Sequence, residues 1–386
     1  MKRRFKKWLL LLLALIMPLP LGGCWDTFEP ERMVYAYGMG VDYKKGQYIV
    51  YLQIINLGLL AKTEVSGGNS EVNVEVGRAT GKTVDQAMSN LYHSAQRRIF
   101  WGHLSFLVLT EEALKQDGVK SVVDLLDRYR ETRYRIWFYA TKDSLPKILL
   151  NTPILGMSSA LSRISDPKAT FQQNSFIQPI NMREVLISIN EPVHEASIPV
   201  ITITKENWMT EKKPHESLEI KGIAVIKRNK LKGVVMGNQA NGLRWMNKKM
   251  KRSGLTVKGK PKDIDVLVAN VKAKVKPIIK KGNIQFDVRV KGEAVIDHVE
   301  QNFNRLALEA KIENKIKNEI MKTYLYGLSI DTDIYHLTEV LYRKNVRVWK
   351  KVEQNGKVPL SKESLRNIQV KIEVIHGEKQ RDKPTI

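Results

Sequence analysis

The sequence predicts a mixed α/β and α+β protein with more than one domain, in which an N-terminal α/β region precedes a C-terminal antiparallel sheet covered by a long helix. Three observations lead to this prediction. Short apolar runs alternate with helical patterns over residues 25–150. Apolar and polar residues alternate with a period of two in several segments of the second half. Between two of those segments an apolar residue recurs every four positions, at Leu308, Ile312, Ile316 and Ile320.

The sequence predicts an export signal over residues 1–23. Basic residues precede an apolar run from Trp8 to Met17, which is too short at about 1.5 Å per residue to cross about 30 Å of hydrocarbon. The run is therefore expected to be removed. The small residues before Cys24 indicate a lipoprotein signal, with cleavage between Gly23 and Cys24 and with S-diacylglycerol and N-acyl chains on Cys24. An ordinary signal peptide with an incidental cysteine is the alternative.

Cys24 is the single cysteine among 386 residues, so packing must stabilise the mature chain without an internal disulfide. No later segment approaches 18 consecutive apolar residues, which predicts a soluble body tethered to a membrane by its lipid. The length suggests two or three domains. We place them at 24–150, at 151–215 as a bridging segment or small middle domain, and at 216–386.

Charge is distributed unevenly along the chain. The formal net charge is +24, and most of the excess after the leader lies beyond residue 216. Such asymmetry indicates an anionic partner surface. Export argues against nucleic acid and in favour of anionic lipid, where each nearby basic residue contributes about 1 kcal/mol. The densest basic run is the candidate contact, with a solvated loop as the alternative, and it comprises Lys248, Lys249, Lys251 and Arg252.

Within residues 24–150 the predicted elements follow one another closely. They are a hairpin of strands 35–42 and 48–55, a loop over 61–73, a capped helix over 84–93, a strand over 103–109, a helix over 119–130, a strand over 134–140 and a helix from Ser144. The proline-rich segment 151–214 predicts short helices and one strand.

In the C-terminal domain, alternation predicts strands around 271–275, 284–290 and 368–374 in an antiparallel sheet, with a turn over 277–283. The helix around 308–320 should cover this sheet, and Glu313 is placed to pair with Lys317. A docking surface for a partner helix is the alternative for its apolar stripe.

Catalytic patterns are mostly absent from the sequence. The histidines are scattered, and neither His194 nor His215 begins a pair at metal-binding spacing, so we expect no metal site and no cofactor. Asp331 and Asp333 could share one face of a strand and bind a cation, but a turn or helix cap is the favoured reading. We therefore expect a protein that is not an enzyme.

Several short segments of distinctive sequence occur in order over most of the mature chain. The first are Cys24, Trp25 and Asp26, followed by Gly38, Gly40 and Asp42. Further segments follow at Arg97, Arg98, Gly102, His103, 107–112, 222–233, 241–245, 331–334 and Trp349. In this order they resemble the Ger(x)C lipoproteins, the C-type subunits of bacterial spore germinant receptors. Residues 151–214 resemble the family only in general character, without specific motif matches. The run at 248–252 is more basic than the family pattern.

The resemblance implies a non-catalytic receptor subunit anchored on the outer face of the spore inner membrane. Its partners would be the polytopic A-type and transporter-like B-type subunits, with no small-molecule ligand of its own assured. Two other classes stay open. A solute-binding lipoprotein of a transporter would need two similar lobes around a cleft, and an anchored envelope enzyme would need a cluster of perturbed carboxylates or histidines.

Overall fold

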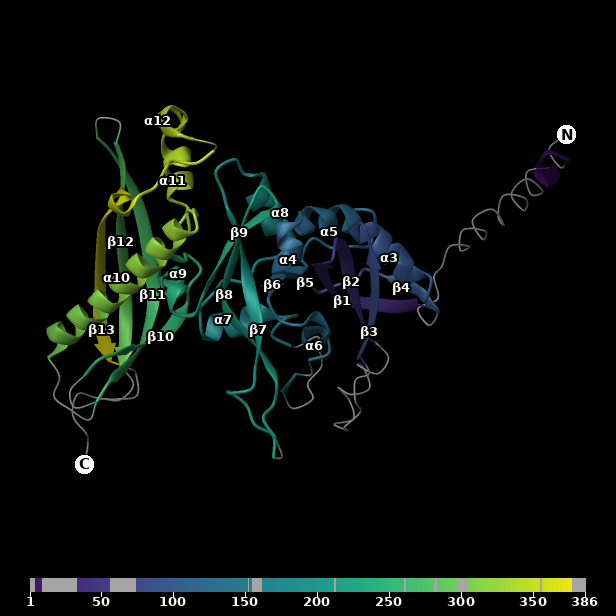
Figure 1. Ribbon diagram of the computed structural model, residues 1–386, viewed down its shortest axis with the longest axis horizontal. Helices are drawn as coiled ribbons and strands as arrows, with labels where there is room; N and C mark the ends of the chain where they lie inside the picture. The colour runs from purple at the N-terminus through teal and green to yellow at the C-terminus, as the bar shows by residue number, and fades with distance from the viewer. Residues whose placement is uncertain are drawn as a thin grey trace.

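The computed structural model describes residues 4–8, 33–55, 74–151, 153–154, 162–211, 213–259, 262–280, 283–296, 304–354 and 356–376. These residues form an elongated molecule with one sheet toward each end (Figure 1). The predicted mixed α/β fold with a C-terminal helix is confirmed. Among the described residues, no helix is long and apolar enough to cross a bilayer.

The N-terminal sheet has nine strands. They are β1 (Met33–Lys44), β2 (Gln47–Ile55), β3 (Val74–Gly81), β4 (Arg98–Phe100), β5 (Phe106–Thr110), β6 (Trp137–Thr141), β7 (Ala196–Thr204), β8 (Ser217–Lys227) and β9 (Lys230–Met236). The order is β3-β2-β1-β5-β6-β7-β8-β9, with β4 also beside β1. The centre β1-β5-β6-β7 is parallel, and antiparallel strands flank it on both sides.

Helices cover both faces of this sheet. One face packs against α3 (Val84–Tyr92), α4 (Glu111–Lys115), α5 (Gly118–Leu126) and α8 (Met182–Asn190), and the other against α6 (Leu145–Leu149). Burial on both sides explains why β5 is buried at all five positions and why its sequence lacks alternation. The helix predicted over 119–130 ends at Leu126, and Tyr129 beyond it stacks on Trp101.

Local signals placed the first elements correctly. β1 and β2 form the predicted hairpin, and Lys45 and Gly46 both take positive φ in its two-residue turn, at 50° and 78°. Helix α3 begins after Thr83, whose side chain accepts a hydrogen bond from Gln86 N at 3.1 Å. The predicted loop over 61–73 lies outside the described residues.

The C-terminal sheet has the order β10 (Arg252–Val257), β11 (Ile264–Lys280), β12 (Asn283–Ile296) and β13 (Leu365–His376). The first three strands are antiparallel as predicted, but β13 pairs with β12 in parallel. The prediction of a wholly antiparallel sheet is thus wrong for this strand. The cause is the crossover through α10 (Arg305–Ser329), α11 (Leu337–Lys344) and α12 (Val346–Val352), which returns the chain to the end where β12 began.

The turn predicted over 277–283 is also wrong, because β11 continues through Pro277 to Lys280. β10 pairs only with residues 264–269, so the part of β11 that contains Pro277 has a strand neighbour on one side only. Proline is tolerated at such an edge because no ladder hydrogen bond is lost there.

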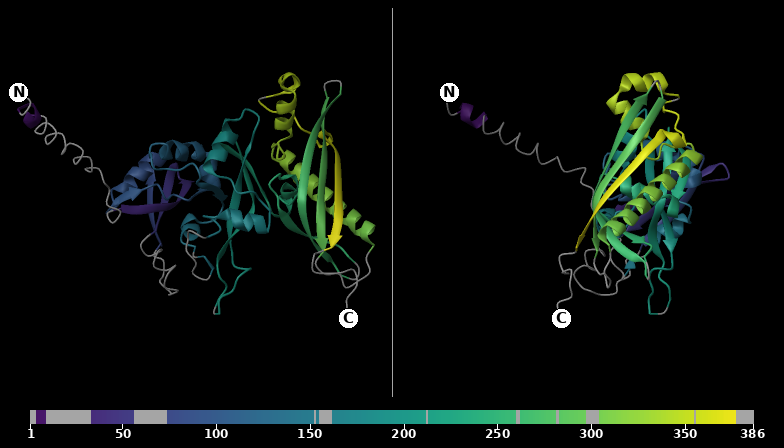
Figure 2. Two further views of the ribbon diagram at one scale, coloured as in Figure 1. Left: turned by 180° about the vertical axis from the view of Figure 1, so that it is seen from behind. Right: turned by 90° about the vertical axis from the view of Figure 1, so that its left-hand side faces the viewer.

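Helix α10 covers one side of β11–β13, as predicted (Figure 2). Leu308, Ile312, Ile316 and Ile320 are buried in the shared core. Glu313 contacts β13, whereas the sequence predicts a pair with Lys317: its Oε1 accepts from Ile372 N at 3.0 Å. Glu309 Oε1 accepts from Val374 N in the same way, so two carboxylates cap the outer edge of β13.

The middle segment contains the expected short helices and one strand, namely α7 (Pro167–Gln173), α8 and β7. Strand β7 belongs to the N-terminal sheet, and β8 and β9 extend that sheet to Met236. The short α9 (Gly242–Met246) then leads into the C-terminal sheet. The sheets therefore divide the chain between Met236 and Arg252, whereas the domain boundary predicted at 215/216 falls just before β8.

Candidate functional site

The predicted lipid-attachment region, with Gly23, Cys24, Trp25 and Asp26, lies outside the described residues. The described body starts at Met33, nine positions after Cys24, and Met33 pairs with Arg98 of β4. Nine extended residues reach at most about 30 Å. Figure 1 places β4 and α3 at the end of the molecule remote from β13. A lipid on Cys24 would tether this end of the molecule to the membrane.

The family-motif residues Gly38, Gly40 and Asp42 lie along β1 and support packing. A Cβ on Gly38 would lie 2.3 Å from the Phe106 ring, and one on Gly40 would lie 3.2 Å from Leu145. Asp42 is buried and accepts from Thr110 Oγ1 at 2.6 Å, where Thr110 is the N-cap of α4. Burial alone would raise the pKa of Asp42, but the hydrogen bonds from Thr110, Lys44 and Tyr43 outweigh it and lower the pKa.

The motif pair Gly102 and His103 lies in the turn between β4 and β5. The expectation that His103 begins a strand is wrong, since β5 starts at Phe106. The exposed His103 ring packs edge-on against Tyr35, with 5.2 Å between ring centroids. A Cβ on Gly102 would lie 2.5 Å from the Phe100 ring, so this turn also needs a small residue for packing.

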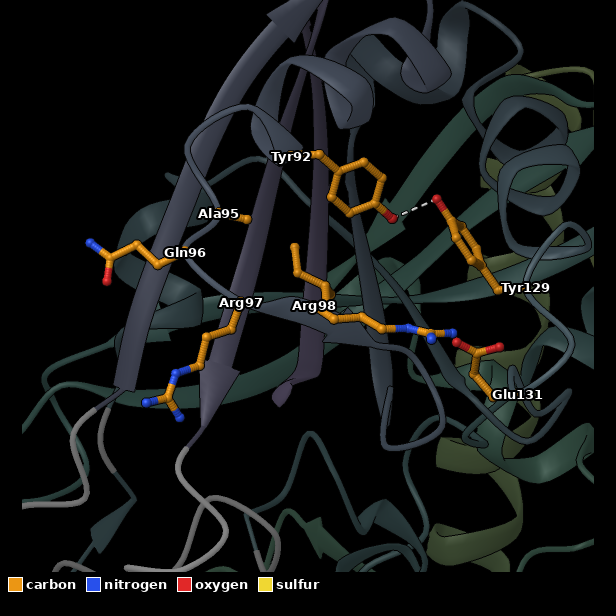
Figure 3. Close-up of a pocket in the computed structure, with 8 residues that line it drawn as sticks. Tyr92, Ala95, Gln96, Arg97, Arg98, Tyr129 and Glu131 are labelled. Atoms are coloured by element: carbon orange, nitrogen blue, oxygen red, sulfur yellow. Dashed lines mark hydrogen bonds between the residues drawn. The ribbon is translucent and has the colours of Figure 1, made fainter. Parts of the chain in front are cut away.

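A cavity of about 500 Å³ opens beside β4 and α3, close to where the described body begins (Figure 3). The hydroxyls of Tyr92 and Tyr129 lie 2.5 Å apart in it. Burial raises the pKa of Tyr92, so this phenol stays neutral at physiological pH and is no general base. Figure 3 shows Arg98 extending toward Glu131 while Arg97 points away. The lining residues described here form a polar recess with no nucleophile and base in contact.

The basic run predicted to meet an anionic surface lies between α9 and β10. All four side chains are exposed, yet two of them contact the middle segment. Lys249 Nζ lies 3.2 Å from Glu184 Oε1 of α8, and Arg252 Nε donates to Gln173 O at 3.0 Å. The run thus connects the C-terminal half to α7 and α8, and its role at an anionic surface stays a prediction.

The sequence analysis missed a second basic surface, on the solvent-facing side of the C-terminal sheet, where Lys371 at the edge lies 3.8 Å from Glu313 of α10. We call it the basic sheet face, and its exposed members are Lys272, Lys274, Lys276, Arg289, Lys291 and Lys371. The register aligns Lys272 with Lys291 and Lys291 with Lys371, in one row across three strands. Like charges directly opposite each other are unfavourable. The alternating lysines of β11 were the signal, but their alignment across strands required the register.

Asp333 acts as the helix cap that the sequence favoured. The buried Asp333 carboxylate accepts from Leu337 N at 2.8 Å and Thr338 N at 2.6 Å at the start of α11. Burial raises its pKa, against the effect of these hydrogen bonds. Its own N–H donates to Glu195 Oε2 at 3.0 Å, which fastens α11 to the start of β7. Asp331 is exposed and pairs with Lys357 and Lys232.

The fold and these surfaces define a class of protein: a two-sheet α/β protein with a basic sheet face and polar links between its halves. Residues 26–203 match the family model described as "spore germination protein N-terminal domain". Residues 221–377 match "spore germination B3/GerAC like, C-terminal". The chain belongs to the Ger(x)C family of spore germination proteins, and the resemblance inferred from the sequence is confirmed.

Individual relatives agree with this assignment. Spore germination protein KC of Bacillus subtilis (strain 168) is 27% identical over 372 residues, covering 90% of each chain. Spore germination protein B3 of the same organism is 23% identical over 318 residues, covering 81% of this chain and 77% of its own. The crystal structure of the GerBC protein matches the fold with a TM-score of 0.54 at 18% identity, over 88% of this chain and 97% of that one.

Proposed function

We propose that this spore germination protein is a non-catalytic, lipid-anchored subunit of a germinant receptor, required for the response of the spore to nutrients. The match of both halves to germination proteins, over nearly the whole length of protein KC, carries the proposal. Cys24 bears the acyl chains on the outer face of the spore inner membrane. The A-type and B-type membrane subunits are its partners.

The basic sheet face lies at the end of the molecule remote from β4, and it gives the subunit a second contact with the bilayer when the elongated body lies along the membrane. Its lysines are aligned directly opposite one another, an arrangement that lowers the stability of the sheet. Such a cost is expected of a surface that binds an anionic partner. Phospholipid headgroups are the partner nearest to a lipid-anchored chain. At about 1 kcal/mol per basic residue, three lysines change partitioning to anionic bilayers on the order of 100-fold.

Replacing Cys24 tests the anchor. Cys24→Ala should leave an intact fold that fails to fractionate with spore membranes, and spores carrying it should lose the nutrient response. Gly22→Ala, which keeps a small residue before the cleavage site, is the matched control. Unchanged membrane retention and unchanged germination of Cys24→Ala spores would refute the anchored-subunit proposal.

Vesicle binding tests the sheet face separately. Purified protein should bind vesicles that contain phosphatidylglycerol and not vesicles of phosphatidylcholine, and raised salt should weaken binding. The triple variant Lys272→Gln, Lys291→Gln, Lys371→Gln should lose this binding. The pair Lys248→Gln, Lys249→Gln reports on the basic run instead. Equal binding by wild type and the triple variant would exclude lipid as the partner of this face, and retained capture of acidic peptides would point to acidic protein loops.

A further inference from the structure

Three potential metal ligands meet at the junction between the two halves of the molecule. His194 lies just before β7, His336 immediately precedes α11, and Glu339 lies in the first turn of α11. Their ligand atoms all lie within 4.8 Å of one another. His194 and Glu339 are 145 positions apart in the chain, which is why histidine spacing gave no sign of the group.

The group is compact and partly shielded from water. His194 Nδ1 lies 2.5 Å from Glu339 Oε2, and the His194 and His336 rings stack with centroids 4.1 Å apart. The side chains of His194 and Glu339 are 21% and 14% exposed. Solvent therefore reaches the edge of the group, which leaves room for a water ligand.

The donor set selects one class of cation. Two imidazoles and one carboxylate suit borderline metals such as Zn²⁺, whereas Mg²⁺ and Ca²⁺ prefer oxygen ligands throughout. Zn²⁺ binds nitrogen and oxygen at about 2.0–2.2 Å, so ligand atoms around it lie roughly 3–4 Å apart. Metal binding therefore requires a side-chain rotation that opens the His194–Glu339 contact and turns the stacked rings so that their nitrogens converge.

Neighbouring groups prepare the three side chains for a metal. Arg343 Nη2 binds Glu339 Oε1 at 2.7 Å, which orients the carboxylate and leaves Oε2 facing the imidazoles. His336 has φ of 54°, a left-handed backbone that is uncommon for histidine and holds its ring over His194.

We propose that His194, His336 and Glu339 bind one divalent transition-metal ion of the Zn²⁺ class, with water as a further ligand. Because His194 lies just before β7 and the other two ligands lie at the start of α11, the bound ion fastens the C-terminal helices to the N-terminal sheet. Binding then raises the free energy of unfolding by RT ln(1 + [metal]/Kd).

Zinc titration of the chelator-treated full-length protein tests the site. Calorimetry should give one equivalent of Zn²⁺ with no response to Mg²⁺, and the melting temperature should rise with zinc. His194→Gln and His336→Asn should weaken zinc binding by about 100-fold or more, since loss of a ligand exceeds the roughly 10–100-fold cost of losing an outer-shell partner. Asparagine is chosen at 336 because it tolerates the left-handed backbone.

His103→Ala is the matched control, since that histidine is exposed at the far end of the molecule. It should bind zinc like the wild type. Co²⁺ substitution gives a readout independent of the variants, because nitrogen and oxygen ligands around a four-coordinate ion produce intense visible absorption bands. Absence of zinc uptake by the wild type, absence of those bands, or equal uptake by folded His194→Gln would overturn the proposal.

Discussion

The two sheets of this protein bury their strands in different ways. In the N-terminal sheet, helices lie on both faces and the central strands are buried at nearly every position. In the C-terminal sheet, α10 covers one side and alternate residues of β12 face solvent. The first sheet thus has little surface to offer a partner, while the second has an open, basic side. This difference indicates that the N-terminal half is mainly structural and that the C-terminal half is available for contact with a partner. Four experiments test the contrast between the two sheets.

The largest effect is expected at the buried ion pair under α10. Glu319 Oε2 accepts from Arg244 Nη2 at 3.0 Å and from Trp245 Nε1 at 2.7 Å. Glu319→Ala leaves the partly buried Arg244 guanidinium without its carboxylate and the buried Trp245 indole without this acceptor, and it should lower the free energy of unfolding by about 3–5 kcal/mol. Urea unfolding should show this loss in the C-terminal half. Glu313→Ala, at a more exposed site, is the control, and equal losses would show that burial of the pair is unimportant.

A matched pair of glycines compares the two sheets directly. Gly38→Ala places a methyl group against the Phe106 ring and should cost about 1–3 kcal/mol by overpacking. Gly254→Ala in β10 meets nothing within 4 Å and should change stability by less than about 0.5 kcal/mol. Thermal unfolding of both variants measures the contrast. Similar costs would show that the two sheets are packed equally tightly.

Acid should weaken the cap on the edge of β13. The hydrogen bond from Val374 N, followed by the contacts of Arg305, holds the pKa of Glu309 below its ordinary value of 4.5. The ionised form is therefore favoured in the folded state, and its contribution is complete above pH 4.5 and is lost as the pH falls through the lower folded pKa. Glu309→Gln should cost about 1–2 kcal/mol at pH 7 and less at pH 3. A cost independent of pH would contradict this role.

The smallest effect concerns the basic sheet face. Lys291→Gln removes the middle charge of the row Lys272–Lys291–Lys371 and should raise stability by about 0.2–1 kcal/mol at low salt. The gain should vanish at about 1 M salt, where the Debye length is about 3 Å. Lys120→Gln on α5 changes net charge equally and is the control. If both variants gain alike, net charge and not alignment is responsible.

Features that depend on neighbouring residues could be predicted from the sequence, whereas features that depend on contacts between distant residues could not. The hairpin turn at Lys45 and Gly46 and the cap at Thr83 depend on neighbouring residues, so both were predicted. The parallel pairing of β13 depends on a crossover of three helices, and no residue within β13 signals it.

The candidate sites divide in the same way. The motif residues Gly38, Gly40 and Asp42 could be picked out from the sequence, but their packing roles needed the positions of Phe106, Leu145 and Thr110. His194 and His336 are brought together only by the docking of α11 on the start of β7, so no spacing rule could find them.

Strands β8 and β9 have a consequence for the modularity of the chain. Most of β8 and all of β9 fall within the C-terminal family match, which begins at residue 221, yet both form the last strands of the N-terminal sheet. A chimera that joins halves of two paralogues at that family boundary would have to build one sheet from two parental sequences. Halves exchanged with a crossover after Met236 would keep each sheet whole, so this joint is the expected place for recombination between members of the family.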